Sequence, residues 1–347
     1  MTSVMLREIN EQPDAVAATI AQCLERRSEL RDLFSRDFRS ALFIARGTSD
    51  SVADFGQYLL AVELGIIATS ASPSIATAYG ATVDLRDCVA IAISQSGSTL
   101  EIVETARWAR DMGATVLAIT NVAGSPLAEL ADLAIVTPAG RELAVPATKS
   151  YTTAVAALIA VAAIVADDRA LEEALLRVPQ LLRDQLRSGL PVDAMAAPFL
   201  HAQTAVFSGR GFANGAAREA ALKLKETSGI NAIGSSMADL VHGPIAALNA
   251  AVPLVILSAD AGSPVTPGLI DLAARARAKE VPIIVLGDAD AALASLADLH
   301  VPLQGGDERL APLNLAIPTQ LLAERVARLR GFDPDAPTGL SKVTQTR

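Results

Sequence analysis

Residues 89–110 read VAIAISQSGSTLEIVETARWAR, and this stretch decides how the rest of the chain is interpreted. It opens with an unbroken run of Val, Ala and Ile, which is typical of a strand buried on both faces. A polar turn follows, and the residues after it have the apolar spacing of a helix. A buried strand that passes through a turn into a helix is the building block of a parallel sheet covered by helices.

The same alternation of strand and helix patterns continues along the chain. Short apolar runs lie in both halves, and helical patterns separate them. These runs are ALFIA (41–45), CVAIAIS (88–94), TVLAIT (115–120) and LAIVT (133–137), then AVFSG (205–209), VPLVILS (252–258), VPIIVLG (281–287) and LHVPL (299–303). We therefore predict parallel sheets with helices on both faces.

The second half of the chain repeats the first. Residues 42–66 align with residues 206–230, and identical residues recur at a nearly constant offset. The pairs are Gly47 and Gly211 and Ser94 and Ser258 at an offset of 164, and Asp132 and Asp298 at an offset of 166. The duplication predicts an α/β protein with two tandem domains, each a mainly parallel, flavodoxin-like sheet sandwiched by helices.

The repeat and the patterns around it set the expected domain boundaries. We predict an N-terminal helical segment at 1–36 and a first domain at 37–190, which includes a charged linker helix. A second domain is expected at 191–330. Residues 331–347 form a polar C-terminal tail with two prolines and no strand or helix pattern.

Composition excludes several functional classes. The net charge of −9, with no cluster of Lys and Arg, argues against a nucleic-acid partner. Cys23 and Cys88 lack the spacing of a metal or disulfide site, which indicates a reducing cytoplasm. The N-terminus lacks the apolar region of a secretory signal. The uncharged run at 151–166 is shorter than the roughly 20 apolar residues of a membrane span, so we expect a buried helix and no membrane partner.

The turn ISQSGST after the 88–94 strand is the strongest candidate site. Open α/β sheets bind ligands at the carboxyl ends of their strands. Ser98 and Glu101 have the spacing of a capping box, which predicts that the helix begins at Ser98. One hydroxyl would suffice to cap a helix, whereas this turn has four, beside a flexible glycine. We therefore predict an anion site for a phosphate monoester, in which Gly97 lets the backbone approach the ligand and the hydroxyl donors are Ser94, Ser96, Ser98 and Thr99.

A second turn of similar composition follows the first strand of this domain. Gly47, Thr48 and Ser49 lie between that strand and the next helix. Ordinary turn chemistry explains these residues nearly as well as ligand binding does. Beside the first turn, they are expected to form another wall of the phosphate pocket.

The second copy lacks these hydroxyls and has acquired charges instead. Asp260 stands in the turn where a phosphate would bind, so this copy is predicted to have lost the anion site. Glu219, Lys223 and Glu226 share one helical stripe, which is either an exposed charge ladder or a catalytic row. His242 follows in a Gly-Pro loop, and the ordinary pKa of an imidazole suits proton transfer near neutrality.

With these motifs assembled, the chain resembles the two-domain sugar isomerase (SIS) family. It is similar to the stand-alone glucosamine-6-phosphate deaminases of SIS type and to the isomerase half of glucosamine-6-phosphate synthases. The matching segments are REINEQP, ARGTSD, SQSGST, ELAVPATKSYT, GRGFANGAAREAALKLKE, HGP and GLSKVTQTR. They extend from residue 7 to the C-terminus, so the resemblance covers nearly the whole chain.

The resemblance implies roles for individual residues. The two hydroxyl-bearing turns would hold the sugar phosphate through Ser49, Ser94, Gln95, Ser96 and Thr99. Glu226 would move a proton between C1 and C2, with Glu219 and Lys223 beside it. His242 would open the sugar ring and act in the neighbouring subunit's site, which implies a homodimer. Lys342 would be a further catalytic residue, and the other residues expected to touch the sugar are Val145, Ala147 and Ser341.

Some positions depart from the synthase pattern. Synthases usually have an acidic residue in place of Ser98 and a serine in place of Ala147. They also begin with a glutaminase domain whose catalytic cysteine follows the initiator methionine, whereas Thr2 stands here. We therefore expect no ammonia to be made from glutamine by this chain.

These expectations converge on an enzyme that converts glucosamine 6-phosphate to fructose 6-phosphate and ammonia without a metal or organic cofactor. The alternatives are a fructosamine-phosphate deglycase, a galactosamine-6-phosphate deaminase and a synthase half that takes ammonia from a separate glutaminase. A non-catalytic sugar-phosphate sensor is also open, although a sensor needs only the phosphate loop.

Overall fold

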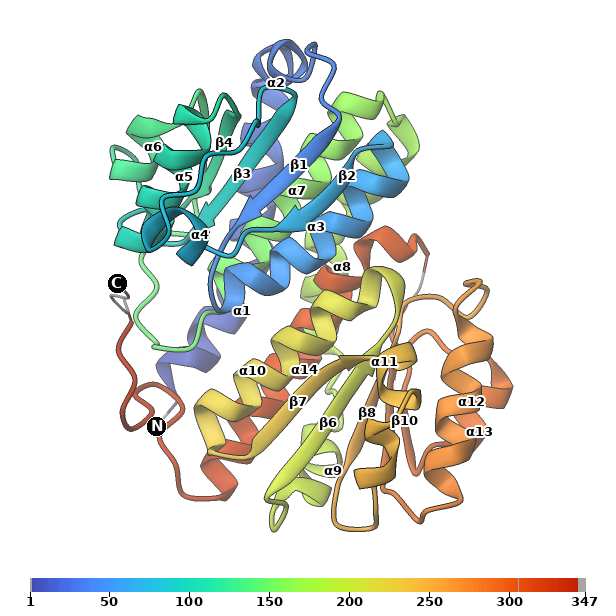
Figure 1. Ribbon diagram of the computed structural model, residues 1–347. Coiled ribbons are helices and arrows are strands. Elements are labelled where there is room, and N and C mark those ends of the chain that lie inside the picture. Colours follow the sequence, from blue (N-terminus) through green and yellow to red (C-terminus); the bar gives the residue numbers. More distant parts are fainter. Residues whose placement is uncertain (1, 305, 343–347) are drawn as a thin grey trace. The chain divides into compact units, whose positions relative to one another are not determined.

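The computed structural model describes residues 2–304 and 306–342, and the chain divides into two compact units (Figure 1). The first-sheet unit comprises Asp14–Glu142 and Lys149–Arg177, together with Ser341 and Lys342. The second-sheet unit comprises the residues up to Pro13, Leu143–Thr148 and Val178–Leu340. Two helices, α1 (Val4–Glu25) and α8 (Arg169–Arg187), have residues in both units. The segment predicted as a linker helix forms α8.

The first-sheet unit contains a five-stranded parallel sheet of order β2-β1-β3-β4-β5. Its strands are β1 (Ser40–Ile44), β2 (Ile67–Ser70), β3 (Cys88–Ser94), β4 (Thr115–Thr120) and β5 (Leu133–Val136). Its helices are α2 (Arg27–Leu33), α3 (Thr48–Leu64), α4 (Ser74–Thr77), α5 (Leu100–Asp111), α6 (Pro126–Leu130) and α7 (Lys149–Ala166). Every residue of β3 and β4 is buried, as their continuous apolar sequences predict.

The second-sheet unit has a parallel sheet of the same topology, with the order β7-β6-β8-β9-β10 in the same direction. Its strands are β6 (Thr204–Gly209), β7 (Asn231–Ser236), β8 (Leu254–Ser258), β9 (Ile283–Gly287) and β10 (Leu299–Val301). Its α-helices are α9 (Val192–Ala196), α10 (Asn214–Ser228), α11 (Met237–Val241), α12 (Thr266–Arg277), α13 (Ala291–Leu296) and α14 (Ala311–Leu329). Short 3₁₀ turns are η1 (Ala197–Phe199), η2 (Gly211–Ala213), η3 (Pro244–Ala247) and η4 (Glu308–Leu310).

Alternate residues of the second sheet enter two different cores. Phe207 and Leu257 pack in the core that contains side chains of α10 and α14. Val206 and Ile256 pack in the other core, which contains side chains of α11 and α12. This separation follows from the two-residue period of a strand, which points neighbouring side chains to opposite faces. The predicted α/β sandwich in two copies is confirmed.

The duplication extends to individual hydrogen bonds. Asp132 accepts a hydrogen bond from the Val116 amide through its carboxylate, at 2.8 Å. Asp298, its counterpart, accepts one from the Ile283 amide, also at 2.8 Å. Each aspartate joins the start of the last strand to the start of its neighbour, so the repeated residues have the same structural role.

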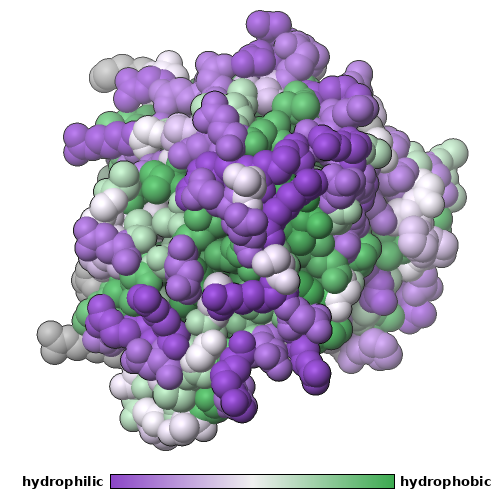
Figure 2. Space-filling model, turned by 90° about the horizontal axis from the view of Figure 1, so that it is seen from above, coloured by the Kyte–Doolittle hydropathy of each residue, from purple (hydrophilic) through white to green (hydrophobic). Residues whose placement is uncertain are grey.

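The predicted buried helix at 151–166 lies within α7. Among the described residues, α7 is the helix long and apolar enough to span a membrane, but 89% of it is buried inside the protein. Burial of this kind is typical of a core helix of a folded domain. On the face shown in Figure 2, hydrophilic side chains interrupt the apolar patches.

Candidate active site

The two hydroxyl-bearing turns follow the carboxyl ends of β1 and β3, which are adjacent parallel strands. In a sheet of this order, the chain connections leave β1 and β3 in opposite directions, which opens a crevice where such folds bind ligands. The two turns therefore lie on either side of the crevice at the carboxyl ends of β1 and β3, where a ligand is expected.

The turn after β3 is organised by its own hydroxyl groups. The Gly97 amide donates to Ser94 Oγ at 3.2 Å, and the Ser98 amide donates to Ser96 Oγ at 3.3 Å. Both serines accept through a lone pair, which leaves their hydroxyl protons able to donate to a guest. Gly97 has a φ of +60°, and a Cβ there would lie 2.1 Å from Ser125 Oγ. Only glycine fits this position.

The predicted capping box is wrong. Helix α5 begins at Leu100, and its N-cap residue is Thr99, whose side chain makes no capping hydrogen bond. Glu101 instead forms an ion pair with Arg46, with Nε and Oε2 separated by 3.0 Å. The first turn of α5 therefore presents its amides without a side-chain cap, as an anion site requires.

The turn after β1 has the same character. Gly47 is the N-cap residue of α3, with a φ of 60°, and it makes no side-chain cap. The partly buried Thr48 and Ser49 are the first residues of this helix, and the Ser49 amide donates to the Arg46 carbonyl at 3.2 Å. The Arg46–Glu101 ion pair joins this turn to the start of α5. Neither residue of that pair was predicted as a site residue.

A second polar cluster of the first-sheet unit contains Lys342. Its Nζ lies 2.7 Å from Oε2 of Glu142, whose side chain is 0% exposed. Glu142 also accepts hydrogen bonds from the amide and hydroxyl of Ser150 in the first turn of α7. The carboxylate therefore stabilises the start of α7 and holds the tail. Ser341 is exposed, and residues 343–347 of the predicted tail motif lie outside the described residues.

The predicted row on α10 is buried rather than an exposed ladder. Lys223 is 1% exposed and Glu219 is 3% exposed. The Lys223 ammonium lies 2.5 Å from Glu226 Oε2 and 3.6 Å from Glu219 Oε1. Glu226 is the member that reaches solvent, with 24% of its side chain exposed. A cation thus lies between two carboxylates, one of them accessible to a substrate.

Two other predicted residues lie on segment Leu143–Thr148 of the second-sheet unit. The Val145 amide donates to the Asp335 carbonyl at 2.9 Å. The carboxylate of the buried Glu8 accepts from the amides of Leu143 and Ala144. The first half of the segment is therefore held by hydrogen bonds, and Val145 and Ala147 remain partly exposed. The structure does not bring this segment into a described contact with Glu226.

His242 is exposed at the C-terminal end of α11. Its backbone amide donates to the Ala238 carbonyl at 3.2 Å, and within the described residues its ring makes no hydrogen bond. The structure therefore does not place the imidazole against Glu226. Its predicted role stays a prediction.

The corresponding turn of the second copy is occupied by carboxylates. Asp260 Oδ1 accepts from the Gly262 amide at 2.9 Å, and Asp288 Oδ2 accepts from the Ala261 amide at 3.4 Å. These carboxylates accept hydrogen bonds from the loop amides that would otherwise be available to an anion, and their negative charge repels a phosphate. This geometry supports the prediction that the second copy has lost the anion site.

Metal-binding groups are sparse in the described ranges. Residues 2–304 and 306–342 contain no group of three His, Cys, Asp or Glu arranged to hold a metal ion. Both cysteines are buried, and burial raises the pKa of the Cys23 thiol to about 12. A thiol in that state is a poor metal ligand. The expected absence of a metal cofactor stays a prediction.

Two parallel five-stranded sheets flanked by helices define the chain as an α/β protein with two tandem flavodoxin-like domains. The SIS domain model matches residues 36–164 and 199–328, so the chain belongs to the SIS family of sugar isomerases.

Relatives of known sequence and structure agree with this assignment. The chain is 35% identical to a glutamine–fructose-6-phosphate aminotransferase (isomerizing) from Thermococcus kodakarensis, over 97% of this chain and 57% of that protein. It thus spans little more than half of that relative. The C-terminal domain of glucosamine-fructose-6-phosphate aminotransferase from Francisella tularensis is 28% identical, with a TM-score of 0.88 over 97% of this chain and 99% of that one. A proposed phosphosugar isomerase from Silicibacter pomeroyi is 31% identical, with a TM-score of 0.85 over 96% and 100%.

Proposed function

We propose that this chain is an isomerising glucosamine-6-phosphate deaminase, which converts glucosamine 6-phosphate and water to fructose 6-phosphate and ammonia. The observation that carries the proposal is the buried row on α10, which ends in the accessible carboxylate of Glu226. Isolating charges from water is costly, so a fold keeps such a row where the charges have a function.

The chemistry needs one well-placed base. In the open-chain amino sugar, the hydrogen on C2 is acidic because the aldehyde carbon is its neighbour. Glu226 takes that proton while O1 gains one, which gives an enolamine; it then returns the proton to C1 while the nitrogen loses one, which yields a 2-imino ketose. Water then adds to the imine carbon and ammonia leaves. The Lys223 ammonium lies 2.5 Å from the Glu226 carboxylate and fixes the position of this base.

Substrate recognition is assigned to the turns that follow β1 and β3. Uncapped helix starts and hydroxyl protons bind a phosphate without a lysine. The name of the Thermococcus kodakarensis relative specifies fructose 6-phosphate and an isomerising reaction, which supports the same sugar for this chain. We further propose a cytoplasmic location, because phosphorylated sugars are intracellular metabolites.

A non-catalytic sensor of the same sugar is less well supported. Binding a phosphate requires the turns of the first-sheet unit only. A sensor gains nothing from Glu219 and Lys223, which are almost completely buried charges in the other unit. Their presence favours proton transfer.

A substrate panel tests the proposal directly. Purified protein is incubated with glucosamine 6-phosphate, galactosamine 6-phosphate and a fructosamine phosphate, and ammonia and ketose phosphate are measured. We expect ammonia and fructose 6-phosphate in equal amounts from glucosamine 6-phosphate, at the highest rate of the panel. Faster ammonia release from another compound of the panel would reassign the substrate. If none of the three compounds is converted, the proposed deaminase activity is refuted.

We also propose that His242 opens the sugar ring and that a second copy of the chain receives it. Its exposed imidazole, with no described contact to Glu226, suits action on a partner subunit. Mixing inactive Glu226→Gln and His242→Ala proteins is expected to restore activity, because a hybrid dimer has one site with both residues intact. Measured ammonia release should approach a quarter of the wild-type rate if subunits exchange at random. A mixture that stays inactive after verified exchange contradicts the shared site.

A further inference from the structure

Arg46 occupies a position that the proposed phosphate site leaves unexplained. It lies between β1 and Gly47, in the turn beside the β1–β3 switch point. Its side chain is 46% exposed, so the guanidinium reaches solvent at the carboxyl ends of the strands, where the ligand is expected. The hydroxyl-bearing turns themselves contain no other Arg or Lys.

The guanidinium is held from one side only. Its Nε donates to Glu101 Oε2 at 3.0 Å, and its Nη1 makes a long contact of 3.5 Å with the Ala45 carbonyl. Within the described residues the guanidinium makes no other hydrogen bond or ion pair, so the Nη2 group remains available as a donor. An arginine has five N–H donors in a planar fork that matches the oxygens of a phosphate.

Glu101 determines where the fork lies. Its side chain is 11% exposed and belongs to the first turn of α5, the helix whose uncapped start is the proposed anion site. A carboxylate at that position would repel a phosphate if it stood alone. Paired with Arg46, it is neutralised, and it fixes the guanidinium beside the α5 amides.

We infer that Arg46 is a cationic ligand of the phosphate group and that Glu101 is the residue that positions it. This inference rests on the proposed phosphate-binding role of the two turns, and it adds a charge contact to the hydroxyl and amide donors. A site with one such cation favours the doubly charged phosphate ester over neutral sugars.

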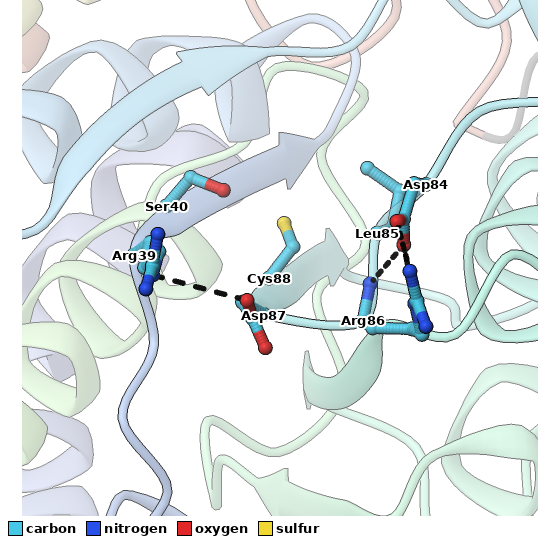
Figure 3. Close-up of a pocket in the computed structure, with 7 residues that line it drawn as sticks. All are labelled: Arg39, Ser40, Asp84, Leu85, Arg86, Asp87 and Cys88. Carbon is cyan, nitrogen blue, oxygen red and sulfur yellow. Dashed lines mark hydrogen bonds and ion pairs between the residues drawn. The ribbon is translucent and has the colours of Figure 1, made fainter.

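A pocket of about 430 Å³ at the opposite end of the same strands contains the residue used for the matched control (Figure 3). It lies at the amino ends of β1 and β3, where such folds do not bind their substrates. Arg86 lines it and pairs with Asp84 at 2.6 Å, and Figure 3 shows this pair apart from the Arg39–Asp87 pair. Arg86→Gln therefore removes the same charge from the same unit, away from the proposed site.

Calorimetric titration with inorganic phosphate tests the inference without requiring catalysis. Arg46→Gln is expected to weaken phosphate binding by about 10- to 100-fold, the range for loss of a charge-assisted hydrogen bond. Arg46→Lys should retain part of the affinity, because it keeps the charge but not the fork. Glu101→Gln should weaken binding less than Arg46→Gln does, and Arg86→Gln should match wild type within twofold.

The outcomes separate this inference from the proposed reaction. Phosphate binding by Arg46→Gln within twofold of wild type would overturn the inference, and so would an equal loss in Arg86→Gln. A wild-type chain that does not bind inorganic phosphate overturns it as well. If Arg46→Gln loses phosphate affinity while wild type releases no ammonia from any amino sugar, the inference stands and the deaminase proposal fails. An unchanged melting temperature in Arg46→Gln excludes a merely structural effect.

Discussion

Replacing Glu226 with glutamine is expected to abolish exchange of the C2 proton while leaving sugar-phosphate binding intact. Glutamine has nearly the same shape and can still accept a hydrogen bond from Lys223, but it cannot take a proton from carbon. General-base catalysis typically contributes 10²- to 10⁴-fold, so we expect kcat to fall by about that factor. Proton exchange is followed by NMR in D₂O, and substrate affinity by titration calorimetry.

Lys225→Gln is the control for this experiment. Lys225 is exposed on the same helix, one residue from Glu226, so the substitution changes one charge without touching the buried row. It should retain both exchange and turnover. If Glu226→Gln exchanges the C2 proton at more than a tenth of the wild-type rate, another group is the base and the mechanism must be reassigned.

The central strands could be predicted because burial on both faces leaves a continuous apolar sequence. The edge strands β2 and β7 were missed, whereas the edge strands β5 and β10 were among the predicted runs. In β2 no residue is buried, and Ile67 is 71% exposed. An edge strand with exposed side chains is defined by backbone pairing with its neighbour, whereas β5 buries alternate residues and so keeps a recognisable apolar sequence.

Local patterns failed where a tertiary contact competed with them. Ser98 and Glu101 have the spacing of a capping box, but Glu101 finds a guanidinium 55 residues away in sequence. A charged partner at 3.0 Å outweighs a local hydrogen bond to the backbone, so the helix begins later than predicted. Glu142 was missed for a similar reason, since its partner Lys342 is 200 residues distant.

The row on α10 shows what a sequence pattern leaves undecided. The spacing of Glu219, Lys223 and Glu226 placed them on one stripe of a helix, which is equally typical of a solvated surface and of a catalytic row. Burial distinguishes the two, and it depends on the packing of α10 against α14 and the second sheet. Packing against distant elements is not encoded in the local spacing.

Burial also predicts a large stability effect at the centre of that row. Lys223→Met removes the ammonium that contacts both carboxylates. Glu219, one of these carboxylates, is only 3% exposed in the native structure. Removing one partner of a buried ion pair costs about 3–5 kcal/mol, because the remaining charge is not resolvated. We expect the free energy of unfolding, measured by urea denaturation, to fall by that amount.

Two further variants identify the cause. Arg275→Met breaks the Arg275–Asp271 pair on α12, which has the same i,i+4 spacing but side chains that are 54% and 50% exposed. Solvent screens such a pair, so a loss of about 0–1 kcal/mol is expected. The double variant Glu219→Gln/Lys223→Met removes the Glu219 carboxylate together with the Lys223 ammonium. It should recover part of the stability that Lys223→Met loses. If Lys223→Met were as mild as Arg275→Met, the row would be solvated in solution, and the argument that places the catalytic base on α10 would lose its physical basis.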